Sequence, residues 1–76
     1  MGVSIYANNG TQQVVLLDEQ PSVTYVGYAN PNSDTAAPVW RIKRLLTTGT
    51  VLAVEFADGN PKYDNIWNDR ASLVYS

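Results

Sequence analysis

The chain of 76 residues carries five Lys or Arg against seven Asp or Glu, a formal net charge of -2, and neither His nor Cys. The low positive charge disfavours nucleic-acid binding, and without His and Cys the commonest general base, the thiol nucleophile and the strong zinc ligands are missing. No stretch approaches the roughly 20 apolar residues of a membrane-spanning helix, so we expect one soluble β domain over residues 1–76 that uses no cofactor.

Residues 1–20 are predicted to form an amino-terminal arm or an edge strand. Residues 1–9 contain one short apolar alternation, and Asn8-Asn9-Gly10 is typical of a turn because Asn and Gly tolerate positive φ. Residues 12–17 are a β-rich run that the polar residues 18–21 close. An arm of this kind can dock on a neighbouring subunit by adding a strand to its sheet.

The next strand is predicted at 22–29, where good strand formers alternate between two faces. Gly27 inside it indicates a bulge, or a place where another backbone or a ring comes close. Residues 30–38 contain two prolines and no apolar period, which predicts a loop, and loops of this length often make contacts. The candidate contact residues in this loop are Asn30, Asn32 and Asp34.

A β-hairpin is predicted over residues 39–56, with its turn at 47–50. In its first strand, Trp40 and Ile42 are expected in the core, and Arg41 and Lys43 on the opposite, wet face. A bulge is expected at 44–46, where the alternation breaks. The second strand is expected to add three apolar side chains to the core face of Trp40, namely Leu52, Val54 and Phe56.

The carboxy-terminal part begins with a turn at Asp58-Gly59-Asn60-Pro61, since Asp-Gly is a hairpin dipeptide and proline stops a central strand. Asp64 is expected to cap one short helical turn near 64–70. Tyr63 and Trp67 are expected to plug one end of the core. Residues 72–76 are predicted to form a closing strand that presents Arg70 to a neighbour.

These elements together predict an all-β fold with about five or six short strands. Two architectures remain open at this point. One is a single small barrel, SH3-like or OB-like, and the other is a compact sandwich.

The acidic residues of the carboxy-terminal part suggest two chemical roles. Asp64 with Asp58 or Asp69 could act as an acid and base pair, but 76 residues hardly build an active-site cleft. Asp58, Asn60 and Asp64 have a spacing loosely like that of a calcium loop. Tyr63, however, stands where that loop needs glycine, and Asp69 where it needs glutamate. Turn and cap roles are preferred, and neither catalysis nor a metal site is predicted.

The large aromatic and basic side chains supply a candidate interaction surface. Trp40 and Trp67 are preferred as core residues, although Trp67 and Tyr63 could instead stack on a sugar ring. The basic residues within 41–44 could meet an acidic partner, this chain's own Asp64 and Asp69, or, less favourably, phosphates. The residues of this candidate surface are Arg41, Lys43, Arg44, Tyr63, Trp67 and Arg70.

Three segments together resemble a short carboxy-terminal module of many small bacteriophage proteins. They are Trp40-Arg41-Ile42-Lys43-Arg44, Glu55-Phe56-Ala57-Asp58-Gly59-Asn60, and residues 63–73, and the likeness covers about residues 25–75. The resemblance implies a virion protein, assembled in the cytoplasm of a bacterial host, that decorates the capsid or belongs to the head-tail or tail region. Its expected partners are other virion proteins and further copies of itself.

Low charge, many small polar residues and the absence of His and Cys fit a protein that works by packing. Our first expectation is therefore a non-enzymatic structural or interaction module. The second is a carbohydrate- or host-surface-binding module that uses Trp67, Tyr63 and residues 30–34. A third, weaker one is a small early phage protein that inhibits a host enzyme. Neither a nucleic acid nor a membrane is an expected partner.

Overall fold

The computed structural model describes residues 13–76, which form an all-β fold. Four strands build an antiparallel sheet in the order of the chain, β1 (Val14–Glu19), β2 (Val23–Ala29), β3 (Pro38–Thr48) and β4 (Val51–Phe56). A short fifth strand, β5 (Asn65–Ile66), pairs with the beginning of β3, and the 3₁₀ helix η2 (Trp67–Ser72) follows it. The predicted arm at 1–9 and turn at 8–10 lie outside the described residues.

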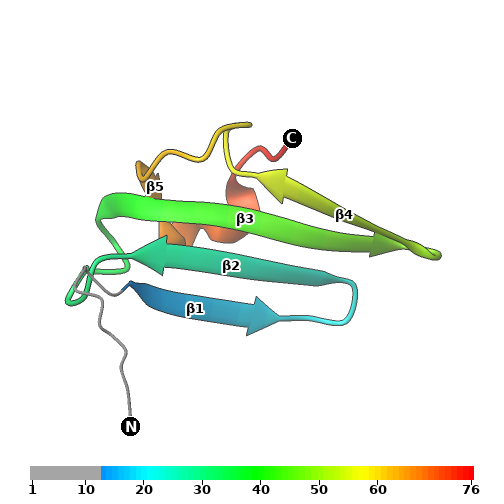
Figure 1. Cartoon of the computed structure of the whole chain (residues 1–76), viewed down its shortest axis with the longest axis horizontal. Coiled ribbons are helices and arrows are strands. Elements are labelled where there is room, and N and C mark those ends of the chain that lie inside the picture. The colour runs from blue at the N-terminus through cyan, green and yellow to red at the C-terminus, as the bar shows by residue number, and fades with distance from the viewer. Residues whose placement is uncertain (1–12) are drawn as a thin grey trace, which may run out of the picture.

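Residues 13–76 do not close into a barrel, because β1 and β4 stand at opposite edges of one open sheet. Figure 1 shows the four strands side by side, with β5 and η2 behind β3. The second layer therefore covers one side of the sheet only. Of the two expected architectures, the small sandwich fits this arrangement. Nothing helical in residues 13–76 has the length and apolarity of a membrane span.

The turn between β3 and β4 decides which side chains share a face of the sheet. Gly49, with φ of 62°, and Thr50 form a two-residue loop that places Val51 opposite Thr48. Even-numbered residues of β3 are therefore paired with odd-numbered residues of β4, and paired residues point to the same face. Ile42 follows this register, since its carbonyl oxygen accepts a hydrogen bond from the amide of Ala57 at 2.9 Å.

The covered face carries the core. Its buried residues are Tyr25, Ala29, Trp40, Ile42, Ala57 and Trp67, with Leu16, Val23, Leu73 and Tyr75 packed against them. Trp67 lies over Gly27, where an added Cβ would fall 2.5 Å from Cε3 of the indole ring. The predicted close approach at Gly27 is therefore a ring, and it comes from the element that covers the sheet.

Polar contacts join the loop and the second layer to β3. The indole nitrogen of Trp40 donates a hydrogen bond to the carbonyl oxygen of Asp34 at 3.0 Å. The side-chain amide of Asn65, which is buried, donates to the carbonyl oxygen of Trp40 at 3.2 Å. Trp40 and Trp67 also pack against each other, with ring centroids 6.0 Å apart. The prediction that both tryptophans are core residues is confirmed.

Three predictions about the hairpin need correction. Pairing is regular from Lys43 to Thr48, so the bulge expected at 44–46 is wrong, and the irregularity of β3 lies instead between Pro38 and Trp40. The core face predicted for β4 is wrong as well. Leu52 and Val54 point away from the face of Trp40 and are exposed, and Phe56 points the same way. The register explains this orientation. Val54 is paired with Leu45, which lies on the face opposite Trp40 and Ile42, and Ile42 is paired with no residue of β4.

The carboxy-terminal part also differs from expectation. The helical turn begins at Trp67, its amino-terminal cap is Ile66 without a side-chain hydrogen bond, and Asp64 is therefore not a cap. The predicted closing strand at 72–76 is reduced to an isolated bridge between Ala57 and Tyr75. The predicted turn at Asp58 is confirmed, with φ of 59°.

Candidate interaction surface

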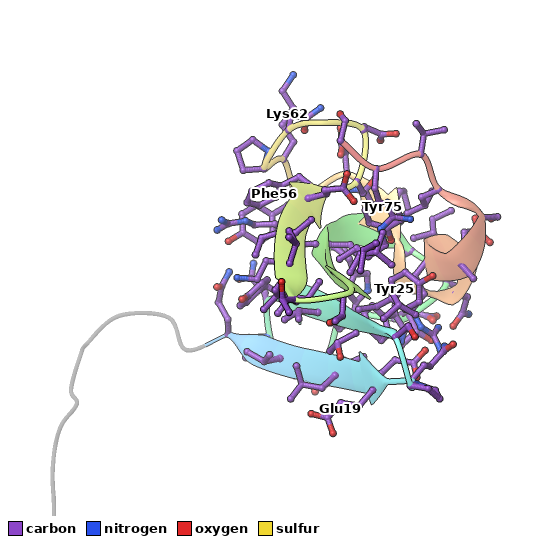
Figure 2. All side chains as sticks on the ribbon, turned by 90° about the vertical axis from the view of Figure 1, so that its right-hand side faces the viewer. Glu19, Tyr25, Phe56, Lys62 and Tyr75 are labelled. Atoms are coloured by element: carbon purple, nitrogen blue, oxygen red, sulfur yellow. The ribbon has the colours of Figure 1, made fainter. Side chains whose placement is uncertain are left out.

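The side of the sheet that β5 and η2 leave uncovered is the candidate surface, and we call it the open face. Figure 2 looks along the sheet and shows Phe56 on this side and Tyr25 and Tyr75 on the other. The register assigns the rest of its side chains. They are Val15, Leu17, Glu19, Thr24, Val26, Tyr28, Arg41, Lys43, Leu45, Thr47, Leu52 and Val54.

Much of the open face is apolar and exposed. Leu17 on β1 is 60% exposed, and Leu52 and Val54 on β4 are 56% and 55% exposed. Only isolated apolar residues are expected on the surface of a monomer, whereas a contiguous apolar patch marks an interaction site. The outer strands β1 and β4 therefore supply apolar contact area on either side of the central strands β2 and β3.

Two cations lie along the middle of the open face. The guanidinium carbon of Arg41 lies 5.5 Å from the ring centroid of Tyr28 and 5.2 Å from that of Phe56. The ammonium nitrogen of Lys43 lies 5.5 Å from the ring centroid of Tyr28. Within residues 13–76 neither cation forms a salt bridge, and Nε of Arg41 is buried without a hydrogen-bond partner. Their positive charge is thus offset by rings and not by carboxylates.

The other two predicted basic residues point to the covered side. Arg44 forms a salt bridge with Glu55, at 2.5 Å between Nη2 and Oε1, and its guanidinium carbon lies 4.7 Å from the ring centroid of Tyr75. Arg70 forms a salt bridge with Asp18, at 2.9 Å between Nε and Oδ2. The predicted basic cluster is therefore divided between the two faces of the sheet, because Arg44 is one residue out of phase with Arg41 and Lys43.

Arg70 is engaged within the chain and is not presented to a neighbour as expected. Its guanidinium carbon lies 4.5 Å from the ring centroid of Trp67. The hydrogen bond from the Gln20 amide, and after it the bond from Arg70, hold the pKa of Asp18 below its usual value. Arg70 thus ties η2 to the edge strand β1.

The two predicted aromatic contact residues have opposite environments. Trp67 is 7% exposed and belongs to the core. Tyr63 is 45% exposed, so its predicted role as a plug of the core is wrong. Its hydroxyl oxygen accepts a hydrogen bond from the side-chain amide of Gln13 at 2.9 Å. This bond, together with the neighbouring Arg41, lowers the pKa of Tyr63 from its usual value.

Tyr63 lines a pocket of about 550 Å³ together with Gln13, Asn30, Ser33 and Val39. Asn30 directly follows β2, and Val39 lies two residues before Arg41, where the pairing of β3 with β2 begins. The pocket therefore lies at one end of the open face. The sequence predicted a site from Tyr63 and residues 30–34, which include Asn30 and Ser33, but it did not predict Gln13 and Val39. Val39 alternates in phase with Arg41 along the predicted strand, so the sequence pattern alone would have placed it on the same face.

The remaining predicted loop residues shape the loop. Asn32 is exposed and has a positive φ of 67°. The carboxylate of Asp34 accepts a hydrogen bond from the amide of Ala36 at 2.9 Å, and its carbonyl oxygen receives the indole N–H of Trp40. Asp34 therefore anchors the loop to the core.

The acidic residues form no metal centre in the part of the chain that the structure describes, since residues 13–76 contain no group of three or more His, Cys, Asp or Glu side chains placed to hold an ion. Asp64 and Asp69 are exposed, and neither forms a salt bridge within this range. Asp69 belongs to η2 and therefore lies on the side of the sheet opposite the open face, whereas Asp64 lies in the loop between Tyr63 and β5.

Comparison with protein-family models, curated proteins and solved structures finds no match for this chain. The resemblance of residues 25–75 to a bacteriophage module therefore stays a prediction from residue pattern. The functional argument rests on the open face, its two cations and the pocket at its end.

Proposed function

We propose that this chain is a non-enzymatic assembly protein that packs its open face against another protein surface. The observation that carries the proposal is the apolar, uncovered side of β1 to β4, on which Leu17, Leu52 and Val54 are each more than half exposed. A sheet with one buried face becomes more stable when its second face is also covered. A small domain benefits in particular, because it has a limited core of its own.

The charges on the open face define the chemistry of the partner. Arg41 and Lys43 favour a surface whose carboxylates meet them within an apolar surround. A second copy of this chain offers such carboxylates at Asp69, on its opposite side, and at Asp64, in the loop that precedes β5. The proposed contact is therefore head-to-tail, from the open face of one copy to these carboxylates of the next. Repetition of such a contact gives a ring or a filament.

The resemblance to bacteriophage proteins supports the setting of this assembly. In that setting the protein is a virion component that decorates the capsid or belongs to the head-tail or tail region, and it is built into the particle in the bacterial cytoplasm. Its partners there are copies of itself and other virion proteins.

Sedimentation velocity over a range of protein concentrations tests the assembly. Val54→Gln, on the open face, is expected to weaken association by about tenfold or more, while Val51→Gln is the matched control. The two valines belong to the same strand, are 55% and 63% exposed, and point to opposite faces. Added salt is expected to weaken association further because it screens exposed charges.

Two results would contradict the assembly proposal. One is a chain that sediments as a monomer at every concentration. The other is an equal effect of Val54→Gln and Val51→Gln, since the open face would then play no special part.

A second candidate function, binding of a carbohydrate or of a host surface, is favoured by the pocket at the end of the open face. The predicted site cannot include Trp67, because that ring is buried against Trp40. Tyr63 and Asn30 remain, and both line the pocket.

A further inference from the structure

The pocket formed by Gln13, Asn30, Ser33, Val39 and Tyr63 differs from the rest of the open face in its chemistry. None of these five side chains is an acid or a base that ionises near neutral pH, whereas the centre of the open face carries two cations. A ligand with a full charge would find no counter-charge among these side chains. These five side chains favour a neutral molecule, whereas Arg41, which neighbours Tyr63 but is not part of this lining, is a cation that an acidic ligand would meet.

The polar groups of the pocket can both donate and accept hydrogen bonds. Asn30 and Gln13 each carry an amide with a carbonyl oxygen and an NH₂ group, and one hydrogen of the Gln13 amide is already given to the hydroxyl of Tyr63. The hydroxyl of Ser33 donates to the carbonyl oxygen of Asn30 at 2.7 Å and keeps its lone pairs as acceptors. The side-chain amide of Asn30 makes no hydrogen bond within residues 13–76, so it is open to a ligand.

Hydroxyl groups are the natural partners of such a lining, because each hydroxyl also donates and accepts. Tyr63 and Val39 add an aromatic ring and an apolar side chain, which suit the C–H face of a sugar ring. The volume of about 550 Å³ lies within the range of small-molecule sites.

We propose that this pocket binds one neutral pyranose unit, with the amides of Asn30 and Gln13 on its hydroxyl groups and the ring of Tyr63 against its apolar face. The inference rests on the second candidate function, carbohydrate binding, and does not depend on self-assembly. Tyr63 has a further part, since its bond to Gln13 holds that amide at the wall of the pocket.

Titration of the ¹⁵N-labelled full chain with glucose, galactose, N-acetylglucosamine and glucuronate, followed by NMR, tests the inference. At least one of the three neutral sugars is expected to shift the side-chain NH₂ signals of Asn30 and Gln13 at millimolar concentration. Asn30→Ala and Tyr63→Ala are each expected to weaken binding about tenfold or more. Tyr63→Phe, which keeps the ring but loses the bond to Gln13, is expected to weaken it less, by about threefold.

Asn68→Ala is the control variant, because Asn68 is an exposed asparagine on η2 whose side chain does not line the pocket. It is expected to bind like the parent protein. Shifts by glucuronate alone would overturn the neutral specificity and leave carbohydrate binding in place. Shifts that survive both Asn30→Ala and Tyr63→Ala would overturn this site and leave carbohydrate binding elsewhere on the chain in place. Absence of any shift would overturn the carbohydrate function as well.

Discussion

Replacement of Gly27 by alanine tests how tightly the second layer packs on the sheet. An added Cβ would lie 2.5 Å from Cε3 and 2.7 Å from Cζ3 of Trp67, and 3.2 Å from Cε3 of Trp40. Both rings are rigid and buried. The methyl group therefore displaces the indole of Trp67, and with it η2.

The expected cost follows from two opposing effects. Forcing an extra carbon into a packed core costs about 1–3 kcal/mol, and contacts with two rigid rings place this site in the upper part of that range. Alanine gains about 0.5–1 kcal/mol over glycine within a strand, because glycine loses more conformational entropy on folding. The net loss in the free energy of unfolding is about 1–2 kcal/mol. In a domain of this size it lowers Tm by roughly 5–15 °C.

Urea denaturation, followed by circular dichroism, measures this loss, and a double-mutant cycle with Trp67→Leu identifies its cause. Once the indole is removed, Gly27→Ala is expected to be neutral or slightly stabilising. Equal costs of Gly27→Ala in the parent and in the Trp67→Leu background would refute the reasoning, because the clash with Trp67 could not then be the source. A Gly27→Ala protein as stable as the parent would refute it too.

Three further predictions concern the same core and its edge. Trp67→Ala is expected to lower the free energy of unfolding by about 3–5 kcal/mol in urea denaturation; unchanged stability would mean that Trp67 is not the core residue described. Asn65→Ala is expected to cost about 1–3 kcal/mol, because it leaves the buried carbonyl oxygen of Trp40 without its partner, whereas an equal cost for the exposed Asn68→Ala would contradict this. Since the pKa of Asp18 is lowered in the folded state, its stabilisation is present above about pH 4 and is lost below it. When the pH is lowered through that range, the Tm of Asp18→Asn is expected to fall less than the Tm of the parent protein. Parallel curves of Tm against pH for the two proteins would contradict this stabilisation by Asp18.

Local pattern was sufficient for most of the strands. Alternation and turn residues predicted β2, β3 and β4 nearly at their observed bounds, and the close approach at Gly27 was predicted from its place within a strand. The same alternation predicted that Arg41 and Lys43 share a face opposite Trp40. Each of these features depends on neighbours within a few residues, where side-chain direction follows backbone geometry.

The sequence contains enough information to assign the register of the hairpin between β3 and β4. A two-residue turn at Gly49 and Thr50 pairs Thr48 with Val51, and it therefore assigns Leu52 and Val54 to the face opposite Trp40. The apolar character of these two residues suggested the core instead. Hydrophobicity alone does not say which face of a sheet is covered, and here both faces carry apolar side chains.

By itself the sequence determined an all-β chain that contains neither His nor Cys, the strands with their turns, and the two cations on one face. Only the tertiary structure decided that the second layer covers a single face, that Trp67 is buried while Tyr63 is exposed, and that Arg44 and Arg70 form salt bridges within the chain. It also decided that Gln13 reaches Tyr63 across fifty positions of the chain to form the pocket. Local patterns fix the direction of a side chain relative to its own strand, whereas its burial depends on which distant segment packs upon it.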